Sequence, residues 1–238
     1  MCGRYTLTES PAAIVEAFAD DIPLCGLSEL EGSYDWQPRY NIAPTQYSLI
    51  ASHTEAGATI DLMRWGLIPH WAKDEKNSAK LINARAETVA EKPSFKQSFR
   101  NKRCLVFADG YYEWTTSAGV KQPIFIKPKT KKIIAFAGIW AQWRAPDKRL
   151  VSTYSILTTE SNSDLDHAHH RMPVLIAPEN CACWVSPQTP TEETLQLLRP
   201  AASGTFAYNT VSNYVNSPRN EGPQCILPAV KPPPLAES

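Results

Sequence analysis

The chain has 238 residues, of which 43% are hydrophobic and 20% are charged, a composition typical of a folded globular protein and not of a disordered one. Its 24 Lys and Arg residues balance 24 Asp and Glu residues, so any contact with nucleic acid has to come from a local basic patch. No stretch approaches the roughly 18 apolar residues of a membrane-spanning helix, and without a secretory leader we expect a cytoplasmic protein whose cysteines are free thiols.

The predicted elements begin with a short helix over residues 8–19, because Ser10 suits the N-cap, Pro11 suits the first helical position and apolar residues follow at helical spacing. Residues 20–48 show no period and are rich in Pro, Gly and Asp, which predicts irregular structure. A second short helix is predicted over residues 92–100, where two phenylalanines lie four positions apart.

From Cys104 onward the pattern changes to that of β-strands. The apolar run over residues 104–108 predicts a strand, Asp109-Gly110 predicts a hairpin turn, and residues 111–114 predict the returning strand. Further strands are predicted over residues 123–127, 132–140, 153–158 and 172–176.

Two short helices are predicted near the end of the chain, over residues 178–185 and 190–198. Thr189 is the predicted cap of the second, and Glu192 is its capping-box partner.

One domain and a tail account for the whole chain. Residues 227–238 contain four prolines and few apolar groups, which predicts a disordered tail after a domain over residues 2–226. Because strands dominate and the helices are short, we predict a monomeric α+β protein, with mostly antiparallel mixed β-sheets around a barrel-like core and short peripheral helices.

Basic residues concentrate between Arg64 and Arg103, where ten Lys and Arg residues accompany four Asp and Glu residues, a net charge of +6. Aromatic residues, among them Trp65 and Trp71, are interleaved with them. Cations pair with phosphates and aromatic rings stack on bases, so this pattern suits a strand of nucleic acid. A solvated basic face over core aromatics gives the same pattern, and charge alone favours that second interpretation.

Cys2 has the most distinctive chemistry, because we expect Met1 to be removed before a small residue such as cysteine. One residue then carries both an α-amine and a thiol. The α-amine has an ordinary pKa of about 8, so part of it is neutral at pH 7 and can condense with an aldehyde to a Schiff base. The thiol can close onto the same carbon to give a thiazolidine, although a cysteine at this position more often has no role.

Other side chains could assist this chemistry. His167, His169 and His170 can exchange protons near neutral pH. Glu113 lies among aromatic residues that should raise the pKa of its carboxyl, and the amide of Asn83 could orient an amine or a carbonyl. Taken singly, each of these residues is more often structural.

A zinc site is the alternative interpretation of His167, His169, Cys181 and Cys183. Their spacing does not match common structural zinc sites, and the two cysteine side chains diverge if they lie on a helix. We therefore predict no metal and no small-molecule cofactor.

Several short motifs occur along the chain in one order. They are Met1-Cys2-Gly3-Arg4-Tyr5, Asn41-Ile42-Ala43-Pro44-Thr45, Arg64-Trp65-Gly66-Leu67-Ile68-Pro69, Asn83-Ala84-Arg85-Ala86-Glu87-Thr88, Asp109-Gly110-Tyr111-Tyr112-Glu113-Trp114, Ala137-Gly138-Ile139-Trp140 and His169-His170-Arg171-Met172-Pro173-Val174. With these motifs, from residue 2 to about residue 220, the chain resembles the SRAP family, the SOS-response-associated peptidases that are understood as abasic-site-crosslinking proteins.

The resemblance implies a compact domain around a barrel-like core, a positively charged groove, and an abasic site in single-stranded DNA as the substrate. It implies that Cys2 crosslinks to the lesion, exposed by autocatalytic loss of Met1. Asn83 is then expected to hold the Cys2 amine, and Glu113 to move protons around the Schiff base. His169, the first residue of a His-x-Arg-Met-Pro pattern, is expected to help open the sugar and to help reverse the link.

The resemblance also points to residues that contact DNA. The candidates for phosphate contacts are Arg4, Arg85 and Arg171, because a guanidinium matches phosphate oxygens. Trp71, together with the Ile68-Pro69 turn, is expected to wedge against or stack on the bases beside the lesion, whereas Trp65 suits the core equally well.

Two other functions fit the same residues. A cysteine peptidase acting in trans would use Cys2 and His169 as a dyad, and a binding module would hold single-stranded DNA without reacting. The crosslinking protein alone gives a heat-stable product on abasic DNA, and we expect it to be associated with the nucleoid while it is bound.

Overall fold

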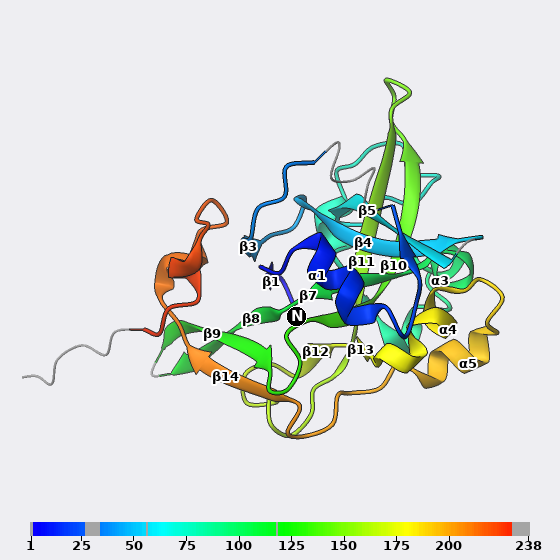
Figure 1. The fold of residues 1–238 in the computed structure, drawn as a ribbon. Coiled ribbons are helices and arrows are strands. Elements are labelled where there is room, and N and C mark those ends of the chain that lie inside the picture. Colours follow the sequence, from blue (N-terminus) through cyan, green and yellow to red (C-terminus); the bar gives the residue numbers. More distant parts are fainter. Residues whose placement is uncertain (1, 27–33, 56, 118, 230–238) are drawn as a thin grey trace, which may run out of the picture.

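The computed structural model describes residues 2–26, 34–55, 57–117 and 119–229, which form two β-sheets with short helices around them (Figure 1). In the smaller sheet the order is β14-β9-β8-β1-β3, and every neighbouring pair is antiparallel. Its strands are β1 (Tyr5–Leu7), β3 (Arg39–Ile42), β8 (Gly110–Ser117), β9 (Val120–Pro128) and β14 (Phe206–Thr210).

The larger sheet closes on itself into a barrel. The strands of the ring are β4 (Tyr47–Thr54), β5 (Gly57–Trp65), β7 (Arg103–Ala108), β10 (Ile134–Arg144) and β11 (Leu150–Glu160). They pair antiparallel in the order β5-β4-β7-β10-β11, and β11 then returns to β5 in parallel, with Thr153 opposite Arg64. The predicted α+β domain with a barrel-like core is therefore confirmed.

Shorter strands extend the ring on its outer side. They are β2 (Leu24–Cys25) beside β5, β6 (Asn83–Arg85) and β12 (Arg171–Pro173) beside β11, and β13 (Leu175–Ile176) beside β10. The strands predicted over residues 104–108, 123–127, 132–140, 153–158 and 172–176 are confirmed as β7, β9, β10, β11 and the pair β12–β13.

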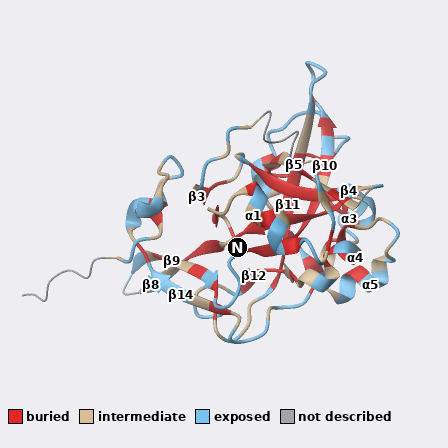
Figure 2. Cartoon of the chain, in the orientation of Figure 1, coloured by how far each residue is buried: buried red, intermediate tan, exposed pale blue. Residues whose placement is uncertain are grey.

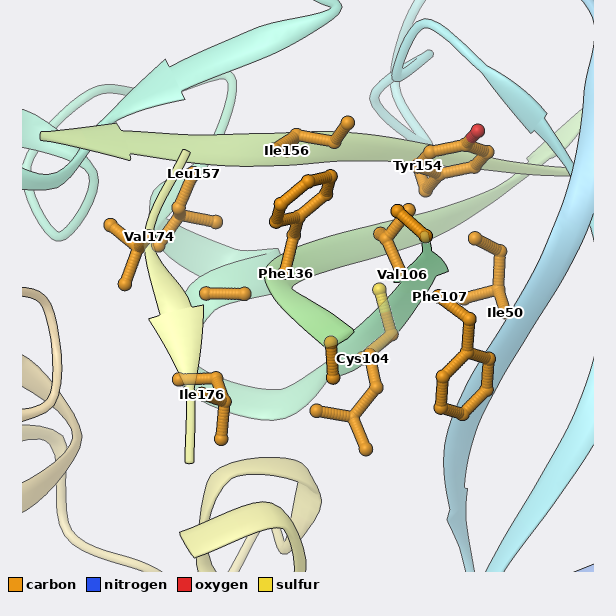
Figure 3. Packing of buried hydrophobic residues seen from close by; sticks show 14 of the residues in the cluster. Ile50, Cys104, Val106, Phe107, Phe136, Tyr154, Ile156, Leu157, Val174 and Ile176 are labelled. Atoms are coloured by element: carbon orange, nitrogen blue, oxygen red, sulfur yellow. The ribbon is translucent and has the colours of Figure 1, made fainter. Parts of the chain in front are cut away.

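Apolar side chains fill the barrel, because alternate residues of each strand point inward. Figure 2 shows that most of the ring is buried. In Figure 3, Ile50 of β4, Val106 of β7, Phe136 of β10 and Ile156 of β11 belong to one cluster, and all four are fully buried. This continuous core gives the short strands at its edges a fixed support.

The helices are short, as predicted, and lie outside the barrel (Figure 1). They are α1 (Pro11–Phe18), α3 (Lys96–Asn101), α4 (Cys181–Val185) and α5 (Thr191–Gln196), with 3-10 turns at Ser78–Lys80, Ala86–Thr88, Pro178–Asn180, Asn213–Asn216 and Pro223–Cys225. The start of α1 is confirmed, since the Ser10 hydroxyl accepts a hydrogen bond from the Ala13 N–H at 3.2 Å.

The predicted cap of α5 is wrong. Pro190 occupies the N-cap position, and the Thr189 hydroxyl instead donates to the Cys183 carbonyl at 2.7 Å. The Thr189 hydroxyl is therefore used in a contact with α4 and does not cap α5.

Residues 20–48 are not irregular throughout, because β2, β3 and the start of β4 lie in this segment. Leu24 pairs with Ala58, and Ile42 pairs with Tyr5. These strands are ordered by partners far away in the sequence, so no local period marks them. Residues 27–33 lie outside the described residues.

The predicted hairpin at Asp109-Gly110 is also wrong. β7 belongs to the barrel and β8 to the smaller sheet, so the chain crosses between the sheets at this point. The Asp109 carboxylate fixes the crossing by accepting hydrogen bonds from the Thr6 hydroxyl and the Thr8 N–H. A Cβ on Gly110 would lie 2.4 Å from the Phe125 ring, so this glycine serves close packing and not a hairpin turn.

The predicted tail begins inside the fold. Pro228 forms a β-bridge with Val211, and the Ala229 N–H donates to the Thr210 carbonyl at 3.1 Å. Residues 230–238 lie outside the described residues. Among the helices of the described ranges, none has the length and apolar character to cross a bilayer.

Candidate active site

Cys2 lies just before β1, and residues of two other strands hold this segment in place. The Arg4 carbonyl accepts a hydrogen bond from the Tyr112 N–H of β8 at 3.0 Å. The Cys2 carbonyl accepts one from the side-chain amide of Asn83 at 2.8 Å. Asn83 opens β6, which pairs in parallel with β11 so that Asn83 stands opposite Ile156. The structure therefore brings together two of the predicted site residues, Cys2 and Asn83.

The Cys2 side chain is buried in this structure, in which Met1 still precedes it. It is 0% exposed and belongs to the main apolar cluster. Burial, and then the negative charge of Glu113, raise the pKa of the thiol far above its ordinary value. A thiol in this state needs a base to remove its proton before the sulfur can attack a carbon.

Glu113 supplies a carboxyl beside Cys2. It lies on β8, two residues beyond Tyr111, which pairs with Tyr5, and its charge is close enough to Cys2 to raise the pKa of the thiol. Glu113 is 5% exposed, and this burial raises the pKa of its carboxyl. A carboxyl with a raised pKa can both give and take a proton near neutral pH.

A layer of aromatic side chains supports Cys2 and Asn83. The Tyr5 and Tyr154 hydroxyls share a hydrogen bond of 2.6 Å, and the Trp65 ring lies edge-on to Tyr5 with ring centroids 5.2 Å apart. The Trp65 indole donates to the carbonyl of Ile82, the residue before Asn83, at 2.9 Å. Trp65 is therefore a core residue that fixes the segment carrying Asn83.

His169 is partly buried and lies two residues before the start of β12. Its Nδ1 accepts a hydrogen bond from the Arg171 N–H at 2.9 Å, so the proton of the neutral ring sits on Nε2. Burial, then the positive charge of the N-terminal amine, and then those of His170 and Arg171, lower the pKa of His169 to about 4. The ring is therefore neutral at pH 7. The hydrogen bonds of the described residues include none between His169 and Cys2 or Asn83, so a shared role stays a prediction.

Arg171 is not presented to solvent, contrary to expectation. Two nitrogens of its guanidinium donate to the two oxygens of Glu87 at 2.7 and 3.0 Å, and one also donates to the Thr158 carbonyl. The residue is buried, because β12 packs against β11 with the guanidinium turned toward β6 and the turn after it. In this structure Arg171 holds Glu87 and also lines a hollow of about 450 Å³, so its contact with a phosphate stays a prediction.

Arg4 is likewise engaged within the protein. Its guanidinium donates to the Asn41 side chain at 2.8 Å and to the carbonyls of Val215 and Asn216 at 2.9 and 3.3 Å. Arg85 is exposed and lines a hollow of about 450 Å³ together with His170. Of the three predicted phosphate contacts, Arg85 is the most exposed and Arg171 lines the same hollow, and contact with DNA stays a prediction for all three.

The residues predicted to wedge against the bases beside the lesion lie partly at the surface and partly in the core. Trp71 is 59% exposed, but Ile68 is 1% exposed and Pro69 is also buried. The Ile68 side chain packs in one cluster with Trp143 but also lines the hollow beside Trp71, so its contact with DNA stays a prediction. Pro69 and Trp71 line a hollow of about 440 Å³. Trp71 keeps its predicted role as a proposal, and Ile68 is a support for it.

Most aromatic residues of the basic segment belong to the core, as the second interpretation of that segment had it. Trp65, Phe95 and Phe99 are buried, and Arg64 pairs with Glu75 at 2.9 Å. Trp71 is the exception. The basic residues of this segment therefore do not alternate with a row of exposed rings, and one of them, Arg103, is itself buried.

The residues of the alternative zinc site take separate positions. Cys181 is buried in α4, where burial raises the pKa of its thiol to about 12, and the His167 ring packs against Tyr208. The described ranges contain no group of three or more His, Cys, Asp and Glu side chains placed to hold a metal ion.

Two functional partners were not found from the sequence. Glu87 holds Arg171, and Tyr154 holds Tyr5 under the Cys2 segment. Glu87 lies within a motif that the resemblance had marked, so it could have been proposed as an ion-pair partner. Tyr154 sits in an ordinary strand pattern, and no sequence signal distinguishes it.

Known proteins share both this sequence and this fold. Residues 1–218 match the family described as SOS response associated peptidase (SRAP). The chain belongs to the SRAP family.

Relatives of this SRAP protein include the "Abasic site processing protein YoqW" of Bacillus subtilis (strain 168), which is 41% identical over 228 residues and covers 95% of this chain and 99% of the relative. The "Abasic site processing protein HMCES" of Gallus gallus is 35% identical over 231 residues, covering 83% and 68%. A solved structure of a Bacteroides thetaiotaomicron protein superposes with a TM-score of 0.81 at 27% identity, over 96% of this chain and 100% of that one.

Proposed function

We propose that this SRAP protein captures abasic sites in single-stranded DNA through a covalent crosslink to Cys2, and so shields the lesion during the response to DNA damage. The observation that carries the proposal is the pairing of Asn83 with Cys2 at 2.8 Å beside the buried carboxyl of Glu113. The names of the relatives at 41% and 35% identity, both abasic site processing proteins, support it.

The first step opens the sugar to its aldehyde. In the closed hemiacetal, the proton of the C1′ hydroxyl has to move to the ring oxygen as the bond between C1′ and that oxygen breaks. Neutral His169 can polarise the ring oxygen with its Nε2–H, because its Nδ1 is already occupied by the Arg171 N–H. Glu113 can carry the hydroxyl proton across, because its raised pKa suits both directions of transfer.

The second step joins the aldehyde to the Cys2 amine. The amine adds to the carbonyl carbon, the resulting hydroxyl takes a proton from the Glu113 carboxyl and leaves as water, and a protonated imine (iminium) remains beside the Glu113 carboxylate. The Oδ1 of Asn83 is buried and has no hydrogen-bond partner among the described residues, so it is available to accept from the amine and hold it for attack.

The third step closes the ring. The Cys2 thiol gives its proton to the Glu113 carboxylate, sulfur bonds to the iminium carbon, and the electron pair of the C=N bond returns to the nitrogen, which becomes a neutral amine. The balance is one aldehyde and one aminothiol converted to one thiazolidine and one water. The raised pKa of the thiol makes this proton transfer necessary.

The direct test uses Cys2→Ala and a uracil-containing oligonucleotide treated with a uracil glycosylase. The wild-type protein should give a heat-stable band that resists SDS and requires the abasic site. Cys2→Ala should lose this band but still form a Schiff base that borohydride traps, with strand cleavage by β-elimination. Cys25→Ala removes an exposed cysteine elsewhere and should behave as wild type. A normal heat-stable band from Cys2→Ala would overturn the mechanism.

The same proposal requires an unblocked Cys2, so we propose that the protein removes its own Met1. The intact mass of the purified wild-type chain should correspond to a chain without Met1. We expect Glu113 to assist the cleavage, so a fraction of the Glu113→Gln chains should keep Met1. A chain that keeps Met1, or carries an acetyl group, and still forms the stable adduct contradicts the proposal.

We further propose that the protein acts as a monomer in the cytoplasm, at the nucleoid when it is bound. Size-exclusion chromatography with light scattering checks the monomer. A gel-shift experiment tests the remaining alternative, a module that binds single-stranded DNA without reacting. Such a module would give a shifted band that SDS removes and that salt weakens.

A further inference from the structure

Trp143 anchors the loop that presents Trp71. Trp143 lies on β10 near the tip of the β10–β11 hairpin, which projects from the barrel in Figure 1. Its indole donates a hydrogen bond to the carbonyl of Ala72 at 2.7 Å, and the ring is buried in a small cluster with Ile68 and Ala145. This cluster is separate from the main core, so its local task is to attach the loop to the hairpin.

A second anchor lies on the other side of Trp71. The Ile68 N–H donates to the hydroxyl of Thr153 on β11 at 2.9 Å, and Thr153 is fully buried. Between the two anchors, the Ala72 N–H donates to the Pro69 carbonyl at 2.9 Å and closes a four-residue turn, with Trp71 at its third position. The backbone on both sides of Trp71 is thus fixed to the hairpin while its ring remains open to solvent.

The surface beside the ring suits a nucleotide. The hollow of about 440 Å³ that Trp71 lines is bordered by the exposed side chains of Lys73 and Lys80, which outnumber the one carboxylate in its lining, that of Asp74. An exposed indole is a platform for stacking a base, and lysines beside it can pair with phosphates. Stacking of this kind is stronger when the ring is held in place beforehand, because less conformational freedom is lost on binding.

We propose that Trp143 is a positioning residue that holds Trp71 in place to stack on the unpaired base next to the abasic site. The proposal rests on the proposed crosslinking function and deepens it. It makes the rate of crosslinking depend on a neighbouring base, and it assigns that dependence to the hydrogen bond from the Trp143 indole to Ala72.

The test compares two oligonucleotides in single-turnover crosslinking. One has a purine on each side of the abasic site, and the other has tetrahydrofuran spacers without bases at those positions. Trp143→Phe keeps an aromatic ring but removes the donor, and should crosslink the first oligonucleotide about 2- to 10-fold more slowly, the range expected for one hydrogen bond. On the second oligonucleotide it should match the wild type. The double variant Trp71→Ala/Trp143→Phe should be no slower than Trp71→Ala.

Two further variants keep the test independent of stability. Thr153→Ala removes the other anchor and should show the same dependence on neighbouring bases. Trp184→Phe removes an equivalent bond, from the Trp184 indole to the Cys104 carbonyl at 2.8 Å in the core, and should leave the ratio of the two rates unchanged. Equal slowing of Trp143→Phe on both oligonucleotides, or a double variant slower than Trp71→Ala, overturns the proposal. If the wild type crosslinks neither oligonucleotide, the proposed function itself fails, and this proposal fails with it.

Discussion

Glu113 and His169 owe their altered pKa values first to burial, and the two shifts have different consequences. The fold disfavours the charged form of each, so the pKa of Glu113 rises and that of His169 falls to about 4. The pKa of Glu113 is thereby brought closer to pH 7, so its carboxyl can exchange protons there, while the His169 ring stays neutral at that pH. The two residues are thus suited to proton transfer and to hydrogen-bond donation respectively.

Replacing Glu113 by Gln should slow formation of the stable adduct by about 100-fold or more, since the amide fills the same space but transfers no proton. Single-turnover crosslinking measured by SDS gel gives the rate. Glu91→Gln, which changes an exposed carboxyl in the same way, should leave the rate unaltered. Equal rates for Glu113→Gln and the wild type would remove Glu113 from the site.

The low pKa of His169 predicts a dependence of stability on pH. Its pKa in the folded protein, about 4, lies below the ordinary 6.5, so the unfolded chain binds more protons between these values and stability falls as the pH drops through this window. His169→Gln should show a smaller fall in the free energy of unfolding from pH 6.5 to pH 4, measured with urea. A variant with the same acid sensitivity as the wild type would mean that His169 titrates normally.

At the level of elements, the pair of Glu87 and Arg171 ties the 3-10 turn at Ala86–Thr88 to β12. Arg171 is buried, whereas Glu87 is about half exposed. The hydrogen bond from Arg171 holds the pKa of Glu87 below its ordinary value. The same strand pair, β12 and β11, fixes the backbone N–H that orients His169. The ion pair of Glu87 and Arg171 therefore helps to fix two predicted site residues, Arg171 itself and His169.

Glu87→Gln should lower the free energy of unfolding by about 1 kcal/mol at pH 7, below the range for fully buried pairs because water screens Glu87. The contribution of Glu87 is present above its ordinary pKa and is lost as the pH falls through its lower folded pKa, so the variant and the wild type should converge in acid. Urea unfolding at pH 7 and pH 3 tests this. Asp147→Asn, in the exposed pair with Arg149, should change nothing measurable. A constant difference at both pH values would contradict the assignment.

For the whole molecule, the parallel pairing of β11 with β5 is what closes the barrel and creates the site. It sets Tyr154 opposite Trp65, and next to it β6 carries Asn83 to Cys2. The chain has no net charge, so the attraction for DNA depends on where individual cations lie. Of the three predicted arginines, Arg85 alone has an exposed placement among the described residues.

Arg85→Ala should weaken binding of single-stranded DNA and reduce the slope of log Kd against log salt by about 0.7, the effect of one lost phosphate contact. Fluorescence anisotropy at several salt concentrations measures the slope, and the Cys2→Ala background keeps the heat-stable adduct from forming. Arg149→Ala, on the exposed tip of the β10–β11 hairpin, is the matched control for loss of one positive charge. An unaltered slope for Arg85→Ala would rule out the phosphate contact.

By itself the sequence determined the order of the motifs, the ring strands β7, β10 and β11, and the reactive potential of Cys2, whereas the ring strands β4 and β5 were not predicted. These follow from local information, since an apolar run such as residues 104–108 specifies a buried strand and an amine with a thiol specifies its own chemistry. The tertiary structure alone decided that Asn83 meets Cys2 across 81 positions, that Arg171 turns inward to Glu87, that Ile68 is buried under Trp143, and that the chain changes sheets at Gly110. Each of these contacts depends on which strands pair, and strand pairing is settled by burial across the whole barrel and not by the residues on either side.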